Sequence, residues 1–112
     1  MGHSRAGAFA ALMLAVASES LPGTAGAADA APHLVRTLCQ TCHGLDGVAV
    51  LQGAANLSGQ QKEYLVEQLR AYRSGRRRNE QMTIIAKPLT DDDIEKLSEW
   101  YSSIKVTVET PK

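Results

Sequence analysis

The chain has 112 residues, a length that allows one small domain at most. Its 12 lysines and arginines balance 12 aspartates and glutamates, which gives a formal net charge of zero. This balance argues against a nucleic-acid-binding protein, because such a domain presents a clearly basic face.

The N-terminal residues have the order of a secretory signal peptide. Arg5 precedes an almost wholly apolar run over residues 6–17, and small residues follow over 22–28. We expect cleavage after Ala27 or Ala28, so that 1–27 is the signal peptide and 28–112 the mature domain. An uncleaved membrane anchor is the alternative, but the apolar run is shorter than the roughly 20 residues of a spanning helix.

The first helix of the mature domain is predicted over residues 31–42. Pro32 is acceptable in its first turn, and Val35 and Leu38 lie on one face. Three glycines then predict a loop over residues 44–57. The first helix therefore leads directly into the only two cysteines of the chain.

These cysteines, Cys39 and Cys42, belong to one pentapeptide, Cys-Gln-Thr-Cys-His, that ends at His43. Two thiols at this spacing can each add across a vinyl group of haem, and the next residue then lies beneath the iron. A domain of this size also tends to need such a staple, because its core is small. The pentapeptide predicts one covalent haem c per chain, with His43 as the proximal iron ligand.

Two other kinds of site use a Cys-x-x-Cys pair. A thioredoxin-like redox disulfide would need strands in a βαβ pattern, and a zinc site would need further Cys or His ligands. The pattern of apolar residues indicates no such strands, and His33 is the only other histidine of the mature domain. Both alternatives are disfavoured.

The second helix is predicted to start after Ser58, which forms a capping-box pattern with Gln61. Aromatic and apolar residues follow at helical spacing until Ser74-Gly75 ends the helix. Residues 76–89 lack a clear period and are predicted to form a loop. This loop begins with Arg76, Arg77 and Arg78. These arginines have three interpretations: a solvated run of charge, partners of the haem propionates, or a docking patch for an acidic redox partner.

The second axial ligand follows by elimination. Haem in electron-transfer cytochromes c is held by His on one side and by Met or His on the other. Met1 and Met13 leave with the signal peptide, so Met82 is the methionine that remains. The rival, His33, stands at the start of the first helix, from which the opposite haem face is hard to reach. The plain alternative is that Met82 fills a gap in the core.

The last helix is predicted to begin at Thr90, with three aspartates in its first turn. Its buried stripe consists of Ile94, Leu97, Tyr101 and Ile104, with Trp100 beside it. The chain after Lys105 is expected to be a loosely held end. Three helices joined by two functional loops make the predicted fold all-α.

Taken together, these residues resemble a class I c-type cytochrome, especially the short bacterial monohaem type and one half of a dihaem cytochrome c. The shared features are the pentapeptide with Gly44, Asp46-Gly47, residues 56–60, Tyr64-Leu65, Gln68-Leu69, Tyr72, Ser74-Gly75, Met82 and Leu89-Thr90. The resemblance implies an all-α fold of three to four helices wrapped around one covalent haem, with His43 and Met82 as axial ligands.

One stretch departs from the family pattern. In this family a proline usually precedes the Asn-Leu-x-Gly-Gln segment, and its carbonyl accepts the Nδ1 proton of the ligand histidine. Here residues 52–55 read Gln-Gly-Ala-Ala. Any backbone carbonyl can accept that hydrogen bond, so the bond can survive in this chain. Because the proline is missing, the rigidity of the loop and the reduction potential of the haem do not follow from the family pattern.

Occupied axial positions predict an electron carrier rather than an enzyme. The leading hypothesis is a periplasmic monohaem cytochrome that passes single electrons between redox proteins, from a dehydrogenase or respiratory complex to an oxidase or reductase. The alternative is a haem-bearing electron-transfer subunit of a flavoprotein or quinoprotein dehydrogenase. A third hypothesis is a haem sensor or peroxidase in which Met82 does not bind iron.

Overall fold

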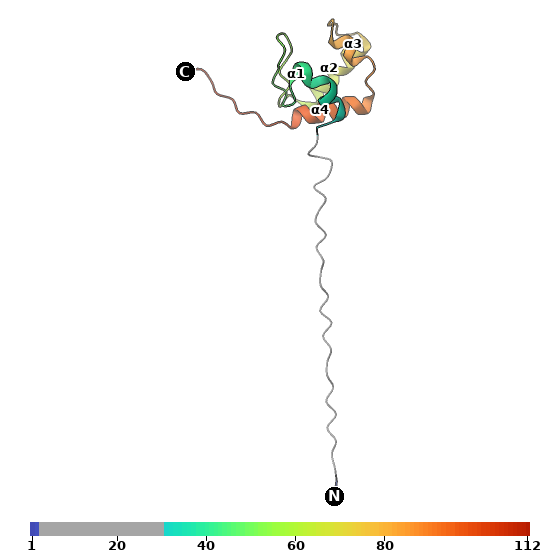
Figure 1. Ribbon diagram of the computed structural model, residues 1–112, viewed down its shortest axis with the longest axis vertical. Coiled ribbons are helices and arrows are strands. Elements are labelled where there is room, and N and C mark those ends of the chain that lie inside the picture. The colour runs from blue at the N-terminus through green and yellow to red at the C-terminus, as the bar shows by residue number, and fades with distance from the viewer. Residues whose placement is uncertain (3–30) are drawn as a thin grey trace.

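The computed structural model describes residues 31–112 together with Met1 and Gly2. Over these residues the chain forms helices and loops without a strand, which confirms the all-α prediction for this part (Figure 1). The predicted signal peptide, 1–27, lies almost wholly outside the described residues. Within that same part, no helix has the length and apolar character needed to cross a bilayer.

The first helical segment carries the pentapeptide. A π-helical turn, η1 (Val35–Cys39), is followed by the short helix α1 (Gln40–His43). The fully buried side chain of Val35 anchors this segment in the core. Gly44 then ends the helix with φ 73° and ψ 157°, so the chain turns away directly after His43.

Helix α2 (Lys62–Ser74) packs against both later helices. Its predicted end is confirmed, because Gly75 adopts the left-handed conformation and its N–H donates to the Tyr72 carbonyl. The predicted capping box is wrong. Ser58 Oγ instead donates to the backbone oxygen of Asp46 at 2.6 Å, so Ser58 closes the preceding loop and does not start the helix.

A short helix, α3 (Met82–Ala86), interrupts the region that the sequence predicts to be a loop. The prediction fails here because Asn79 caps the helix through its side chain. Asn79 Oδ1 accepts from the backbone N–H groups of Gln81 at 3.0 Å and Met82 at 2.9 Å, which satisfies donors that a helix start leaves open. The buried side chains of Ala86 and Leu89 hold this region to the core.

Helix α4 (Asp91–Ser103) begins as predicted. Thr90 Oγ1 accepts from the Asp93 backbone N–H at 3.0 Å, and the Asp93 carboxylate accepts from the Thr90 N–H at 2.9 Å. The expected buried stripe is confirmed for Ile94, Leu97 and Tyr101, whereas Ile104 lies beyond the helix end and is half-buried.

The core lies where these helices meet, because η1, α2, α3 and α4 each present apolar side chains to it. Figure 1 shows α1, α2 and α3 gathered on one side of α4, with the chain after Ser103 leading away from them. The buried members of the core are Ala31, Val35, Leu65, Ala86, Leu89, Ile94, Leu97 and Tyr101.

Candidate functional site

A cavity of about 370 Å³ lies between the helices, within the range of roughly 300–1,000 Å³ that small-molecule sites occupy. Its wall includes Cys39, Cys42, His43 and Met82. The structure therefore brings all four sequence-predicted site residues to one cavity, although Met82 stands on a separate helix from the others.

The rest of the wall suits a large, flat, mainly apolar group. Most of it is apolar or aromatic, and over residues 31–112 it includes no aspartate, glutamate or lysine. Ser98 lines the same cavity, and its buried hydroxyl has no hydrogen-bond partner among the described residues. The main apolar and aromatic lining residues are Leu38, Leu57, Tyr64, Leu65, Leu69, Tyr72, Ile85, Leu97 and Tyr101.

His43 is held by a main-chain acceptor. Its Nδ1 lies 2.7 Å from the Ala55 carbonyl oxygen, so Nδ1 carries the proton and donates it, which leaves the Nε2 lone pair available to a metal. The bond that the family takes from a proline carbonyl is thus made by the alanine of the Gln-Gly-Ala-Ala stretch. The expectation that another carbonyl can serve is confirmed.

The backbone directly after His43 is tied to α4 by two aromatic side chains. Tyr101 donates its hydroxyl to the Gly44 carbonyl at 3.0 Å, and Trp100 Nε1 donates to the Leu45 carbonyl at 2.9 Å. Burial raises the pKa of the Tyr101 hydroxyl far above its ordinary value, so this group remains a donor. The sequence pattern predicts only a buried stripe with Tyr101 in it and Trp100 beside it, although buried Tyr and Trp usually need a partner for their polar ends.

The two cysteines form no disulfide with each other, and both are half-buried. Burial, together with the neighbouring Cys42, raises the pKa of the Cys39 thiol to about 11. Reactive cysteines of redox disulfides and zinc sites instead have lowered pKa values. The surroundings of Cys39 therefore lack the character of a redox or zinc thiolate.

Met82 reaches the cavity as the first residue of α3, and the Asn79 side chain holds its backbone in place. Sequence analysis missed Asn79, although an asparagine shortly before a helix is a common start signal. His33, the rival ligand, is exposed and does not line the cavity. Of the two candidates, Met82 alone stands where it could face His43.

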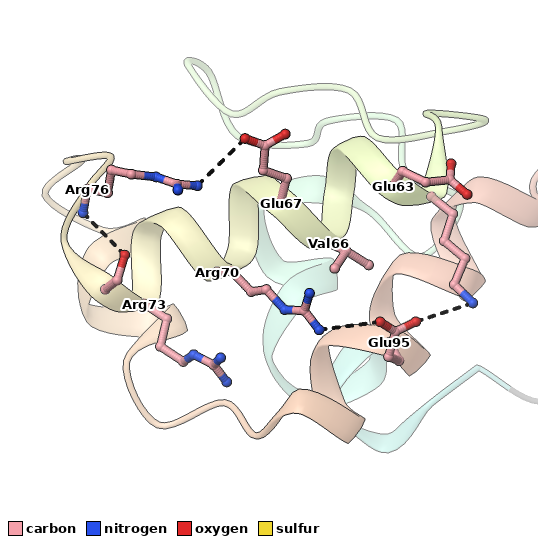
Figure 2. A pocket seen from close by; sticks show the side chains of 9 residues that line it. Glu63, Val66, Glu67, Arg70, Arg73, Arg76 and Glu95 are labelled. Carbon is pink, nitrogen blue, oxygen red and sulfur yellow. Dashed lines mark hydrogen bonds and ion pairs between the residues drawn. The ribbon is translucent and has the colours of Figure 1, made fainter.

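A second hollow, of about 710 Å³, lies on another face of α2 and is bordered by α4 (Figure 2). Most of its charged side chains pair with one another: Arg70 lies 3.7 Å from Glu95, Lys62 lies 3.4 Å from Glu95, and Arg76 lies 3.6 Å from Glu67. Among the described residues that line this hollow there is no cysteine, histidine or methionine. This second hollow offers neither attachment points nor metal ligands for haem.

Comparison with known proteins gives a consistent result. The family model for cytochrome c matches residues 28–105. The chain is 41% identical over 66 residues to cytochrome c4 of Thiocapsa roseopersicina, a match that covers 59% of this chain and 34% of that protein. It is 40% identical over 68 residues to cytochrome c-554(548) of Halomonas halodenitrificans, covering 58% of this chain and 82% of that protein.

A third relative has a name that refers to a partner. The thiosulfate dehydrogenase electron acceptor of Stutzerimonas stutzeri is 35% identical over 69 residues, which cover 59% of this chain and 32% of that protein. The chain thus spans about a third of this relative and of the cytochrome c4, but most of cytochrome c-554(548).

Proposed function

The chain belongs to the cytochrome c family, and we propose that it is a periplasmic monohaem carrier of single electrons. The family binds haem c covalently through a cysteine pair, which in this chain is Cys39 and Cys42. Its members are electron-transfer proteins and not catalysts. The proposal adds the axial ligands, the periplasmic location and the partners.

One observation carries the proposal: His43 and Met82 line the same cavity as the cysteine pair. His43 has its Nε2 free, because Nδ1 is engaged by the Ala55 carbonyl. We therefore assign His43 and Met82 as the two axial iron ligands. When bound, haem supplies an iron that gains and loses one electron, and a thioether ligand favours its reduced form.

Two protein ligands leave no vacant position on the iron. A sensor or peroxidase needs such a position for its ligand or substrate, whereas an electron carrier does not. The apolar wall around the site also keeps water away, so little rearrangement of solvent accompanies the change of charge. Both features support a carrier.

The partners are inferred from chemistry and from relatives. We propose a dehydrogenase or respiratory complex as the electron donor and an oxidase or reductase as the acceptor. The name of the Stutzerimonas stutzeri relative, a thiosulfate dehydrogenase electron acceptor, supports a dehydrogenase as donor. The predicted signal peptide supports the periplasm as the location.

Replacement of Met82 tests the ligand assignment. The Met82→Ala variant should lose the charge-transfer absorption of a methionine–ferric-haem bond, and its reduced form should bind carbon monoxide rapidly at neutral pH. Ile84→Ala is the matched control, because Ile84 lies on the same helix but is 74% exposed. Rapid carbon monoxide binding by the unmodified protein would refute the assignment.

Gel filtration of native periplasm separates a free carrier from a fixed subunit. A carrier should elute as a small protein that shows haem c bands in a reduced-minus-oxidised spectrum. Co-elution with a flavoprotein or quinoprotein dehydrogenase would show that the chain is a subunit of that enzyme and not a free carrier. Absence of the haem c bands from the periplasmic fraction would refute both hypotheses.

A further inference from the structure

The three consecutive arginines have different surroundings. Arg76 lies 3.6 Å from Glu67 and borders the second hollow (Figure 2). All three arginines are exposed, and over residues 31–112 the Arg78 side chain makes no hydrogen bond or ion pair. Arg77 alone among the three lines the cavity that holds Cys39 and His43. The run is therefore not one uniform solvated patch.

The guanidinium of Arg77 is held in place from two sides. Its Nη1 donates to Gln68 Oε1 at 2.7 Å, and its Cζ lies 4.7 Å from the centre of the Tyr72 ring. The Arg77 backbone N–H donates to the Ala71 carbonyl at 3.0 Å. These contacts orient the side chain before any ligand arrives, so little side-chain freedom is lost when a ligand binds.

Among the described residues on the cavity wall, Arg77 is also the only one with a permanently charged side chain. Within the described residues it has no carboxylate partner, unlike Arg70, Arg73 and Arg76. Haem brings two carboxylates, its propionates, and a guanidinium has several donors in a planar fork that matches a carboxylate. Arg77 is exposed and lines the cavity, so it lies where the cavity meets solvent, and a propionate bound there keeps part of its hydration.

We propose that Arg77 binds a haem propionate and that its positive charge raises the reduction potential of the haem. This inference rests on the proposed function, because it requires haem to occupy the cavity. Reduction adds one negative charge to the haem, so a nearby positive charge favours the reduced form. Arg77 then acts as a positioning residue that holds the propionate end of the haem.

The test compares Arg77→Gln, Arg77→Lys and Arg76→Gln. Arg77→Gln should shift the electron-exchange equilibrium with a fixed reference couple toward the oxidised haem by about fivefold to tenfold, where tenfold corresponds to 59 mV. Arg77→Lys should recover much of this shift, because it keeps the charge. Arg76→Gln, whose side chain lies outside the cavity, should leave the equilibrium unchanged.

Resonance Raman spectroscopy supplies the second readout, because the propionate bending band responds to hydrogen bonding at the propionate. Arg77→Gln should move this band and Arg76→Gln should not. Identical potentials and bands in these two variants would overturn the inference. A lowered potential with an unmoved band would overturn the pairing as well, because Arg77 would then act only at a distance.

A further variant guards against loss of the holoprotein. If Arg77→Gln fails to accumulate with haem, Gln68→Ala removes the 2.7 Å bond that orients Arg77 while the charge stays. The propionate band of Gln68→Ala should then differ from that of the unmodified protein, and an unmoved band would overturn the inference. The proposed function fails separately, through loss of the haem c bands or of methionine ligation in the unmodified protein.

Discussion

The two sides of the haem cavity are secured in different ways. On the histidine side, buried or half-buried side chains of α4 bind the main chain at Gly44 and Leu45. On the methionine side, the main capping bonds run from Asn79 to its own neighbours, Gln81 and Met82. Long-range bonds thus secure the histidine, and local bonds secure the methionine. We therefore expect methionine ligation to fail first when the fold is weakened.

The largest expected effect contrasts two glycines. Gly44 follows His43 with φ 73° and ψ 157°, and an added Cβ would run into the Val48 carbonyl oxygen. Gly75 has φ 78°, but an added Cβ meets nothing within 4 Å. Gly44→Ala should lower the free energy of unfolding by about 3 kcal/mol, and Gly75→Ala by about 1–2 kcal/mol.

Denaturant unfolding of the two holoproteins measures this difference. If Gly75→Ala lowered the free energy of unfolding as much as Gly44→Ala, the expected difference between the two sides would be refuted.

The next effect concerns the bond between α4 and the histidine side. Tyr101→Phe leaves the buried Gly44 carbonyl without its donor, so the free energy of unfolding should fall by about 1–3 kcal/mol. Tyr64→Phe is the control, because Tyr64 is 44% exposed and should change little. Thermal or chemical unfolding gives both values. An equal cost for the two variants would mean that the bond to Gly44 does not secure this side.

Two asparagines sharpen the comparison further. Asn79 caps the methionine helix, whereas Asn56 Oδ1 accepts from the Ala49 N–H at 2.8 Å on the histidine side. Asn79→Ala should cost about 1 kcal/mol and should lower the temperature at which methionine ligation is lost. Asn56→Ala should leave that temperature close to the temperature of global unfolding.

The methionine–ferric-haem absorption, followed alongside far-ultraviolet circular dichroism, provides the measurement. Asn79→Ser keeps a side-chain acceptor and should restore most of the lost stability. Coincident loss of both signals in Asn79→Ala would show that the two sides unfold together.

The smallest expected effect on the free energy of unfolding should not distinguish the two sides of the cavity, because α4 contributes to both. Hydrogen bonds from the Thr90 backbone and hydroxyl lower the pKa of the Asp93 carboxyl below its ordinary value. Its contribution to stability is therefore present above about pH 4 and is lost as the pH falls through the lower folded-state pKa. Asp93→Asn should remove about 0.5 kcal/mol at neutral pH.

Unfolding free energies measured from neutral to acidic pH test this expectation. The variant should approach the unmodified protein at low pH, where the Asp93 carboxyl is protonated in both states of the latter. A constant difference at every pH would show that the ionised carboxylate is not the source of the effect.

The sequence was sufficient where the signal is local or chemically distinctive. The pentapeptide pointed to Cys39, Cys42 and His43, the scarcity of methionine pointed to Met82, and the structure brings the four to one cavity. Iron ligation by His43 and Met82 stays a prediction. The start of α4 and the end of α2 follow from short capping patterns that the structure contains. The signal peptide and the division of the chain at residue 27 remain predictions.

The predictions of secondary structure failed where a distant contact decides the local structure, or where an element is too short to show a hydrophobic period. Ser58 matches a helix-start pattern but bonds to Asp46, and no local pattern reveals that contact. Helix α3 has 5 residues, too few for a hydrophobic period to appear. Arg76, Arg77 and Arg78 are chemically identical, so only tertiary structure separates the one that lines the cavity.

The partner of His43 has a consequence for how such a protein can change over time. The Ala55 oxygen that accepts the Nδ1 proton belongs to the main chain, and every amino acid carries that atom. Substitutions at position 55 therefore keep the acceptor of the His43 proton, provided that the loop keeps its path and the new side chain fits the cavity that Ala55 lines. The contact depends on the shape of residues 44–57 and on the α4 side chains that brace it, and not on a particular side-chain chemistry at position 55.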